Sequence, residues 1–216
     1  MRRHLAGSVL LTLLLPLVAR AQQPVAPQSA VIGPFGGINF AKFGGSDVGP
    51  VDTRTGFQAG IFASFPIGKF VAIAPSVSYS QEGTSVDVGG GVSGTFALDY
   101  IEVPVMLKLG APLAGTGQLR PYVMAGPALG FLLTCKVKAS SGSQSAEADC
   151  DDPTVGLDAR SLQVSADFGA GLDIGRFTVG LRYHLGLTSV DDTGADADVK
   201  NRVFSIIAGY GFRLGH

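Results

Sequence analysis

Along most of the chain, apolar residues alternate with small or polar residues at a period of two, which is the pattern of β-strands. Residues 177–188 show it most clearly: the odd-numbered positions are Phe, Val, Leu, Tyr, Leu and Leu, whereas the even-numbered positions include Arg182 and His184. Seven further segments alternate in the same way, at residues 32–41, 56–65, 70–80, 96–109, 119–134, 162–174 and 204–214. The pattern therefore predicts eight strands and no long helix after the N-terminal region.

The predicted strands are long, and the connections between them alternate in length. Strands of about 10 to 15 residues exceed those of ordinary soluble sheets and suffice for a tilted strand to cross a membrane. Long connections are expected at residues 42–55, 83–95, 135–160 and 189–201, and shorter ones at 66–69, 110–118 and 175–176. Outer-membrane barrels have short periplasmic turns and longer outer loops. We therefore predict an all-β fold: an eight-stranded antiparallel up-and-down transmembrane β-barrel with both ends in the periplasm.

In such a barrel the apolar face of each strand contacts lipid, and the small and polar face fills the lumen. The segment from Tyr100 to Lys108 shows the rule, because its apolar set leaves Glu102 and Lys108 on the inner face. An inward charge must be paired or hydrated. The predicted polar cluster of the lumen consists of Gln58, Glu102, Lys108, Asp167, Asp173, Arg182 and His184.

The N-terminus carries the pattern of a cleavable export signal. Arg2 and Arg3 precede an apolar run, and Ala19-Arg20-Ala21 has the small-x-small form that signal peptidase cuts after. The predicted organisation is a signal peptide at residues 1–21, a short linker at 22–30 and the barrel domain at 31–216. The expected location is the outer membrane, with outer-membrane lipid and lipopolysaccharide as surroundings.

Composition supports an exported, lipid-embedded chain. Mean hydropathy is +0.33, and the chain contains 31 glycines. Its formal net charge of −1 argues against nucleic acid as a partner. Cys135 and Cys150 are the only cysteines. In an oxidising compartment they predict a disulfide that closes a loop of roughly 15 residues.

Several motifs resemble the outer-membrane β-barrel domain proteins of the PorT family, small barrels akin to the transmembrane domain of the OmpA type. The most specific is Tyr100-Ile101-Glu102-Val103-Pro104. The others are Gly36-Gly37-Ile38-Asn39-Phe40, Gly56-Phe57-Gln58-Ala59-Gly60, Pro75-Ser76-Val77-Ser78-Tyr79-Ser80-Gln81-Glu82-Gly83 and Pro121-Tyr122-Val123-Met124-Ala125-Gly126-Pro127.

This resemblance implies the outer-membrane location and the barrel fold, and its named member looks like a secretion-related accessory factor. We expect a non-catalytic barrel with a structural or interaction role. The resemblance also implies contact with the barrel assembly machinery, which reads aromatic residues at the C-terminus of such barrels. Tyr210 and Phe212 are the candidates for that insertion signal, although Arg213-Leu214-Gly215-His216 follow them. The outer loops are expected to meet an unidentified protein partner.

The inner charges could line a pore for small solutes, but a narrow eight-stranded lumen favours a salt-bridged plug. His184 with Ser78 or Ser80 and Glu82 could form a hydrolase site, yet alternation points His184 inward, away from a lipid substrate.

The acidic stretches 149–152 and 191–198 lack the closing glutamate of a calcium loop, so they are interpreted as solvated loops, with no metal and no cofactor expected. A secreted lipocalin-like barrel would bury its apolar face and expose its polar face. The inner face expected here is too poor in charge to serve as a water-exposed surface.

Overall fold

The computed structural model describes residues 29–113, 118–142, 144–153, 159–191 and 198–215. Residues 1–28, which contain the predicted export signal and most of the predicted linker, lie outside this part. Within the described residues the strands are β1 (Ala30–Gly44), β2 (Arg54–Pro66), β3 (Val71–Gly89), β4 (Val92–Gly110), β5 (Leu119–Ser141), β6 (Gln144–Asp149), β7 (Leu162–Ile174), β8 (Phe177–Gly186), β9 (Lys200–Tyr210) and β10 (Phe212–Leu214).

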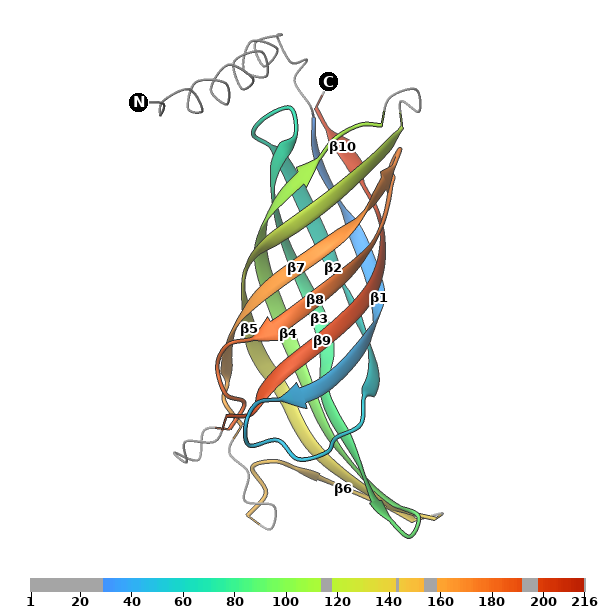
Figure 1. The fold of residues 1–216 in the computed structure, drawn as a ribbon, viewed down its shortest axis with the longest axis vertical. Coiled ribbons are helices and arrows are strands. Elements are labelled where there is room, and N and C mark those ends of the chain that lie inside the picture. The colour runs from blue at the N-terminus through green and yellow to red at the C-terminus, as the bar shows by residue number, and fades with distance from the viewer. Residues whose placement is uncertain (1–28, 114–117, 143, 154–158, 192–197, 216) are drawn as a thin grey trace, which may run out of the picture.

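The strands form one closed antiparallel sheet. Neighbours along the chain pair in order from β1 through β5 and then β7 to β9, and β9 pairs back with β1 from Phe35↔Gly209 to Gly44↔Lys200. β10 continues the last wall strand after Gly211 and also pairs with β1. The wall therefore has eight strands, counting β9 and β10 as one, which confirms the predicted fold class (Figure 1).

The outside of this wall is apolar and the inside is polar, as the alternation predicts. Each wall strand exposes at least one large apolar side chain, among them Ile38, Ile61, Val77, Leu107, Phe131, Phe168, Leu181 and Ile206. The buried polar residues include Asn39, Gln58, Ser80, Glu82, Glu102, Gln163, Asp167, Arg182, His184, Asn201 and Ser205. A lipocalin has the reverse arrangement, with its apolar face inside. An apolar exterior can contact lipid, and a closed sheet leaves no unpaired backbone groups that would need water.

Two predicted loops are wrong, because the strands continue through them. Residues 83–95 extend the β3–β4 hairpin, whose tip is a glycine run at 89–91 with positive φ. Residues 135–141 extend β5, and β6 returns along it. Gly83 permits the β3 extension, since its φ of 110° and its contact with the Phe96 carbonyl leave no space for a Cβ. The hairpins project beyond the barrel at the end opposite the start of β1 (Figure 1).

We call this end, with the long hairpins, the loop end, and the other the turn end. The turn end holds the β2–β3 and β7–β8 turns, the start of β1 and the end of β10 (Figure 1). We expect it to face the periplasm.

Among the described residues, no helix has the length and apolar character needed to cross a membrane.

Candidate functional site

The middle of the lumen is filled by a network of amide and hydroxyl side chains. Gln58 donates from Nε2 to Asn39 Oδ1 at 2.9 Å, and Ser205 Oγ donates to the same oxygen at 2.9 Å. Asn39 Nδ2 in turn donates to Ser80 Oγ at 3.0 Å. These contacts join β1, β2, β3 and β9 across the inside of the wall, so they close part of the lumen.

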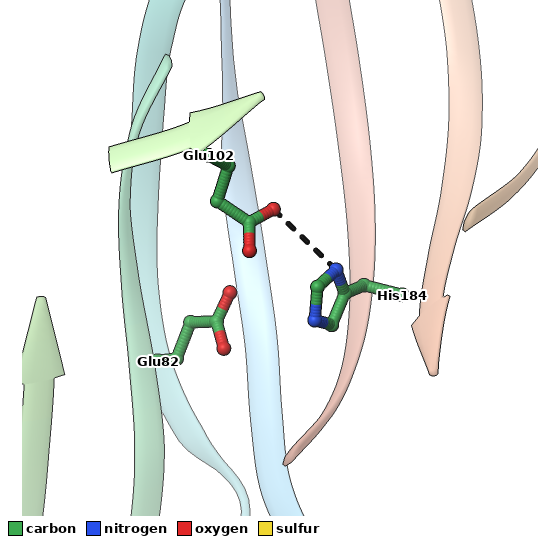
Figure 2. Close-up of side chains that lie close together, drawn as sticks. All are labelled: Glu82, Glu102 and His184. Atoms are coloured by element: carbon green, nitrogen blue, oxygen red, sulfur yellow. Dashed lines mark ion pairs between the residues drawn. The ribbon is translucent and has the colours of Figure 1, made fainter. Parts of the chain in front are cut away.

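Beside this network lies a fully buried group of three carboxylates and one imidazole. Glu82, Glu102, Asp167 and His184 come from β3, β4, β7 and β8, and their exposed fractions are 1%, 6%, 0% and 3%. His184 Nδ1 lies 2.9 Å from Asp167 Oδ1 and 3.4 Å from Glu102 Oε2. Figure 2 shows Glu82, Glu102 and His184 pointing toward one another from three strands. We call these four residues the acid–histidine cluster.

Two amides hold the other side of the imidazole. Asn201 Nδ2 donates to Gln163 Oε1 at 2.7 Å, and Gln163 Nε2 lies 2.7 Å from His184 Nε2. With these amide orientations Gln163 donates to Nε2, so the proton of the neutral imidazole is on Nδ1, on the carboxylate side. Gln163 therefore contacts one ring nitrogen, and the carboxylates of Asp167 and Glu102 lie near the other. Neither is directed at Ser78 or Ser80, so this geometry does not form the hydrolase arrangement.

Several atoms of this region lack hydrogen-bond partners although they are buried. They are Glu82 Oε2, Glu102 Oε1, both carboxylate oxygens of Asp167, His184 Nδ1 and Asn201 Oδ1. His184 Nδ1 lies close to Asp167 Oδ1, but this contact does not have the geometry of a hydrogen bond. Buried polar atoms are usually satisfied, so this concentration calls for an explanation.

Lys108 and Asp173 form a separate pair nearer the turn end, so the seven predicted lumen residues do not make one cluster. Lys108 Nζ contacts both carboxylate oxygens of Asp173, at 2.8 and 2.7 Å, and lies 3.9 Å from the centre of the Tyr122 ring. This pair is partly accessible, because both residues line a cavity of about 860 Å³ at the turn end. Hydration and mutual pairing account for these two charges.

Arg182 lies between the two charged groups. Its guanidinium is 5.3 Å from the centre of the Phe35 ring, and the two residues line a small cavity of about 40 Å³ together with Lys108 and Tyr122. Its Nε has no hydrogen-bond partner. The lumen therefore narrows from the 860 Å³ cavity to this small one before it reaches the acid–histidine cluster.

The sequence-based selection missed several members of this site. Gln163 and Asp167 share the inner face of one predicted strand, yet only Asp167 was selected. Glu82 continues the inner-face series of the strand at 70–80, but it lies beyond the predicted end of that strand and enters the sequence-based reasoning only as a hydrolase candidate and as part of a family motif. Continuing the period of two beyond Ser80 finds Glu82, whereas Gln163 already lies on the inner face of the predicted strand at 162–174 and differs from Asp167 in carrying no charge.

The predicted disulfide is present, and it holds the base of a projecting sheet. Cys135 on β5 is bonded to Cys150 just after β6, with a Cα–Cα distance of 5.4 Å. Beyond the barrel, β4 and β5 pair from Leu98↔Cys135 to Val92↔Ser141, and β6 pairs only with β5. On this sheet Glu147 accepts from Lys136 at 2.6 Å and lies 2.7 Å from Lys138 Nζ. We call the extensions of β3, β4 and β5 together with β6 the projecting sheet (Figure 1).

Tyr210 and Phe212 lie at the turn end, on the last wall strand. Their rings are 5.0 Å apart, and Tyr210 also packs edge-on against Phe177 at 5.1 Å. Arg176 donates to the Tyr210 hydroxyl at 3.2 Å. The acidic loop expected at 191–198 lies mostly outside the described residues, which include only Asp191 and Asp198 of its aspartates.

Comparisons with solved structures return small membrane proteins. The attachment invasion locus protein Ail of Yersinia pestis is 17% identical, covering 86% of this chain and 99% of that chain with a TM-score of 0.43. Neisserial surface protein A is 14% identical, with coverages of 85% and 97% and a TM-score of 0.49. OprG from Pseudomonas aeruginosa is 12% identical, with coverages of 87% and 98% and a TM-score of 0.45.

Sequence comparison gives a family assignment. No curated protein sequence matches the chain. A family model described as an outer membrane protein beta-barrel domain matches residues 21–192. Since this match covers most of the chain, and the structure is a closed antiparallel barrel with an apolar exterior, the protein belongs to the outer membrane β-barrel domain family.

Proposed function

We propose that this chain is a non-catalytic outer-membrane barrel that conducts no solute and acts through the projecting sheet as a structural or interaction protein. The observation that carries the proposal is the filled mid-section of the lumen. Asn39, Gln58, Glu102, Asp167 and His184 all point inward there and are buried. Eight strands enclose a space that side chains can fill completely, and here they do so with groups from all sides of the wall.

Conductance in planar lipid bilayers tests this proposal. Wild-type protein is expected to give no stable channels, whereas the double variant Arg182→Ala, Glu102→Ala is expected to open the narrowest part and conduct. The matched control is Lys136→Ala, Glu147→Ala, which removes an ion pair from the projecting sheet and leaves the lumen unchanged. Stable wild-type channels would overturn the closed-lumen proposal and favour passage of small solutes, for which the 860 Å³ cavity is a ready entrance.

The projecting sheet supports the interaction role. Its outer edge is β6, which pairs with β5 alone and leaves a row of backbone groups available to another chain. The disulfide and the contacts of Glu147 with two lysines hold this edge in place, so a partner meets a preformed surface. A secretion-related accessory role, as the PorT resemblance implies, is the version of this proposal in which the partner is a secretion component.

Contact with lipopolysaccharide is supported by two basic residues on the lipid-facing side. Lys42 of β1 lies directly opposite Arg202 of β9, and both are exposed. Like charges in a cross-strand pair repel, and among the described residues neither has an acidic partner. The aromatic pair of Phe40 and Phe204 sits next to them, at 6.5 Å. A phosphate group of an outer-leaflet lipid would satisfy both cations at once.

Lipopolysaccharide retention during purification tests that contact. Lys42→Ala with Arg202→Ala should lower the amount that copurifies, whereas Lys69→Ala, on the β2–β3 turn at the opposite end, should leave it unchanged. Equal amounts in all three proteins would contradict a specific contact.

The insertion role of Tyr210 and Phe212 also remains a proposal. Both rings lie on the exposed side of the closing strand, where an assembly factor can reach them before the barrel closes. Replacing both by alanine should slow insertion in vivo, while the purified variant should still reach the heat-modifiable folded form. Normal insertion of that variant would contradict the role.

A further inference from the structure

We propose that the acid–histidine cluster is a binding site for one divalent transition-metal ion, held by His184, Glu82 and Glu102, with Asp167 beside them. One ligand atom from each of these three residues lies within 4.8 Å of the other two. They come from β8, β3 and β4, so an ion there would tie three strands together inside the barrel. Figure 2 shows that the space between the three side chains is where their polar ends converge.

The separations suit a small ion. Ligand atoms bound to one tetrahedral ion at about 2.0–2.2 Å are about 3.3–3.6 Å apart. His184 Nδ1 and Glu102 Oε2 are already 3.4 Å apart. Since the widest separation among the three is no more than 4.8 Å, side-chain shifts of about 1 Å would complete the coordination.

The unpartnered atoms point to a missing cation. Glu82 Oε2, Glu102 Oε1 and His184 Nδ1 belong to residues that are more than nine-tenths buried, and none of these atoms has a hydrogen-bond partner. An ordinary buried network would satisfy them. Oxygen and imidazole donors in this mixture suit Zn²⁺ or Mn²⁺ better than Ca²⁺, which prefers oxygen ligands alone.

The charge balance leads to the same conclusion. Three carboxylates converge with one imidazole, and no lysine or arginine of the described part forms an ion pair with any of them. Arg182, on the inner face, lies against Phe35 and attracts the Glu102 carboxylate without forming an ion pair with it. Arg54 donates a hydrogen bond to the backbone carbonyl of Glu82, and its charge is shared with Asp99. Buried carboxylates need a counter-charge, and a divalent ion provides two positive charges at one point.

The neighbouring amides can adapt to a bound ion. At present Gln163 donates to His184 Nε2, which puts the imidazole proton on Nδ1. If the amides of Gln163 and Asn201 both turn over, Nε2–H donates to Gln163 Oε1, and Gln163 Nε2 donates to Asn201 Oδ1, an atom that now lacks a partner. This reversal frees the Nδ1 lone pair for the ion and gives the second nitrogen the acceptor that metal-bound histidines usually have.

Metal analysis of the full-length, untagged protein in detergent micelles tests the proposal. After chelator treatment and addition of Zn²⁺, or of Mn²⁺ in a parallel sample, about one ion per barrel should remain after gel filtration. Glu102→Gln and His184→Asn should each weaken binding at least tenfold. Asp173→Asn is the matched control, since it removes a lumen carboxylate from the Lys108 pair and should retain wild-type affinity.

Three outcomes would overturn the site. The first is a wild-type barrel that retains no stoichiometric ion. The second is a loss of metal affinity in Asp173→Asn equal to that in Glu102→Gln. The third is full metal binding by the triple variant Glu82→Gln, Glu102→Gln, His184→Asn. Heat-dependent gel migration shows whether each variant is folded. Should the variants not fold, X-ray absorption of the zinc-loaded variant His4→Ala, His216→Ala decides, because His184 is then the only histidine of the protein. One imidazole with oxygen ligands supports the site, and an all-oxygen shell contradicts it.

Discussion

The same lumen holds charge in two different ways. At the turn end, Lys108 and Asp173 neutralise each other at 2.7 Å beside a cavity of about 860 Å³. Toward the loop end, Glu82, Glu102 and Asp167 converge on His184 with almost no exposure, and no lysine or arginine of the described part forms an ion pair with them. A pair near water needs only its partner, whereas a buried excess of one charge needs a proton or a bound cation.

The largest expected effect comes from removing the imidazole. His184→Leu leaves three buried carboxylates without their neighbour, so the free energy of unfolding should fall by about 3–5 kcal/mol. Urea unfolding of the purified barrel, followed by gel mobility without boiling, measures it. Leu185→Ala, a change on the outer side of the same strand, is the control for a general weakening of β8. A loss below about 1 kcal/mol would mean that the three buried carboxylates do not depend on the imidazole for the stability of the folded barrel.

A smaller effect is expected from the amide that supports the imidazole. Gln163→Leu removes the partner of His184 Nε2 and of Asn201 Nδ2, which should cost about 1–3 kcal/mol of unfolding free energy. The exposed Gln144 on β6 provides the comparison, since Gln144→Leu changes the same side chain in water. Equal effects at the two positions would show that burial at Gln163 contributes nothing.

Breaking the Lys108–Asp173 pair should lower the free energy of unfolding less than His184→Leu or Gln163→Leu does. Lys108→Met leaves Asp173 beside the hydrated cavity, where water replaces part of the lost contact. The expected loss is about 1 kcal/mol in the same urea experiment. A loss as large as that of His184→Leu would remove the distinction between the two regions.

The smallest effect on stability is expected on the projecting sheet, whose charges are exposed to water and can be compared with those of both lumen regions. Hydrogen bonds from Lys136 and Lys138 lower the pKa of Glu147 from its ordinary value to about 2. A lowered pKa stabilises the folded sheet at pH values above the ordinary pKa, and this contribution disappears as the pH falls toward 2. Carbon NMR of the Glu147 carboxyl should titrate near 2 in the wild type and move toward the ordinary value in Lys136→Ala, Lys138→Ala. An unchanged midpoint in that variant would contradict the cause given.

Local patterning predicted the wall well, because a strand's two faces alternate regardless of its neighbours. The range of β7 follows directly from the run between Leu162 and Ile174. The sequence does not predict the β3–β4 extension, since Gly83 and the glycine run at 89–91 are typical of loops, and only pairing with β4 keeps residues 83–89 in a strand. For the same reason Glu82 lies beyond the predicted end of the strand at 70–80 and is absent from the predicted polar cluster of the lumen.

The sequence by itself determined the eight-stranded wall, its apolar exterior, the inward direction of His184 and Glu102, and the pairing of Cys135 with Cys150. Each of these follows from a period of two or from a count of residues, which are local properties of the chain. Only the tertiary structure decided which inward residues meet, because depth along the lumen depends on strand tilt and register between strands. That register separates Lys108 and Asp173 from His184 and brings Glu82 and Glu102 to it.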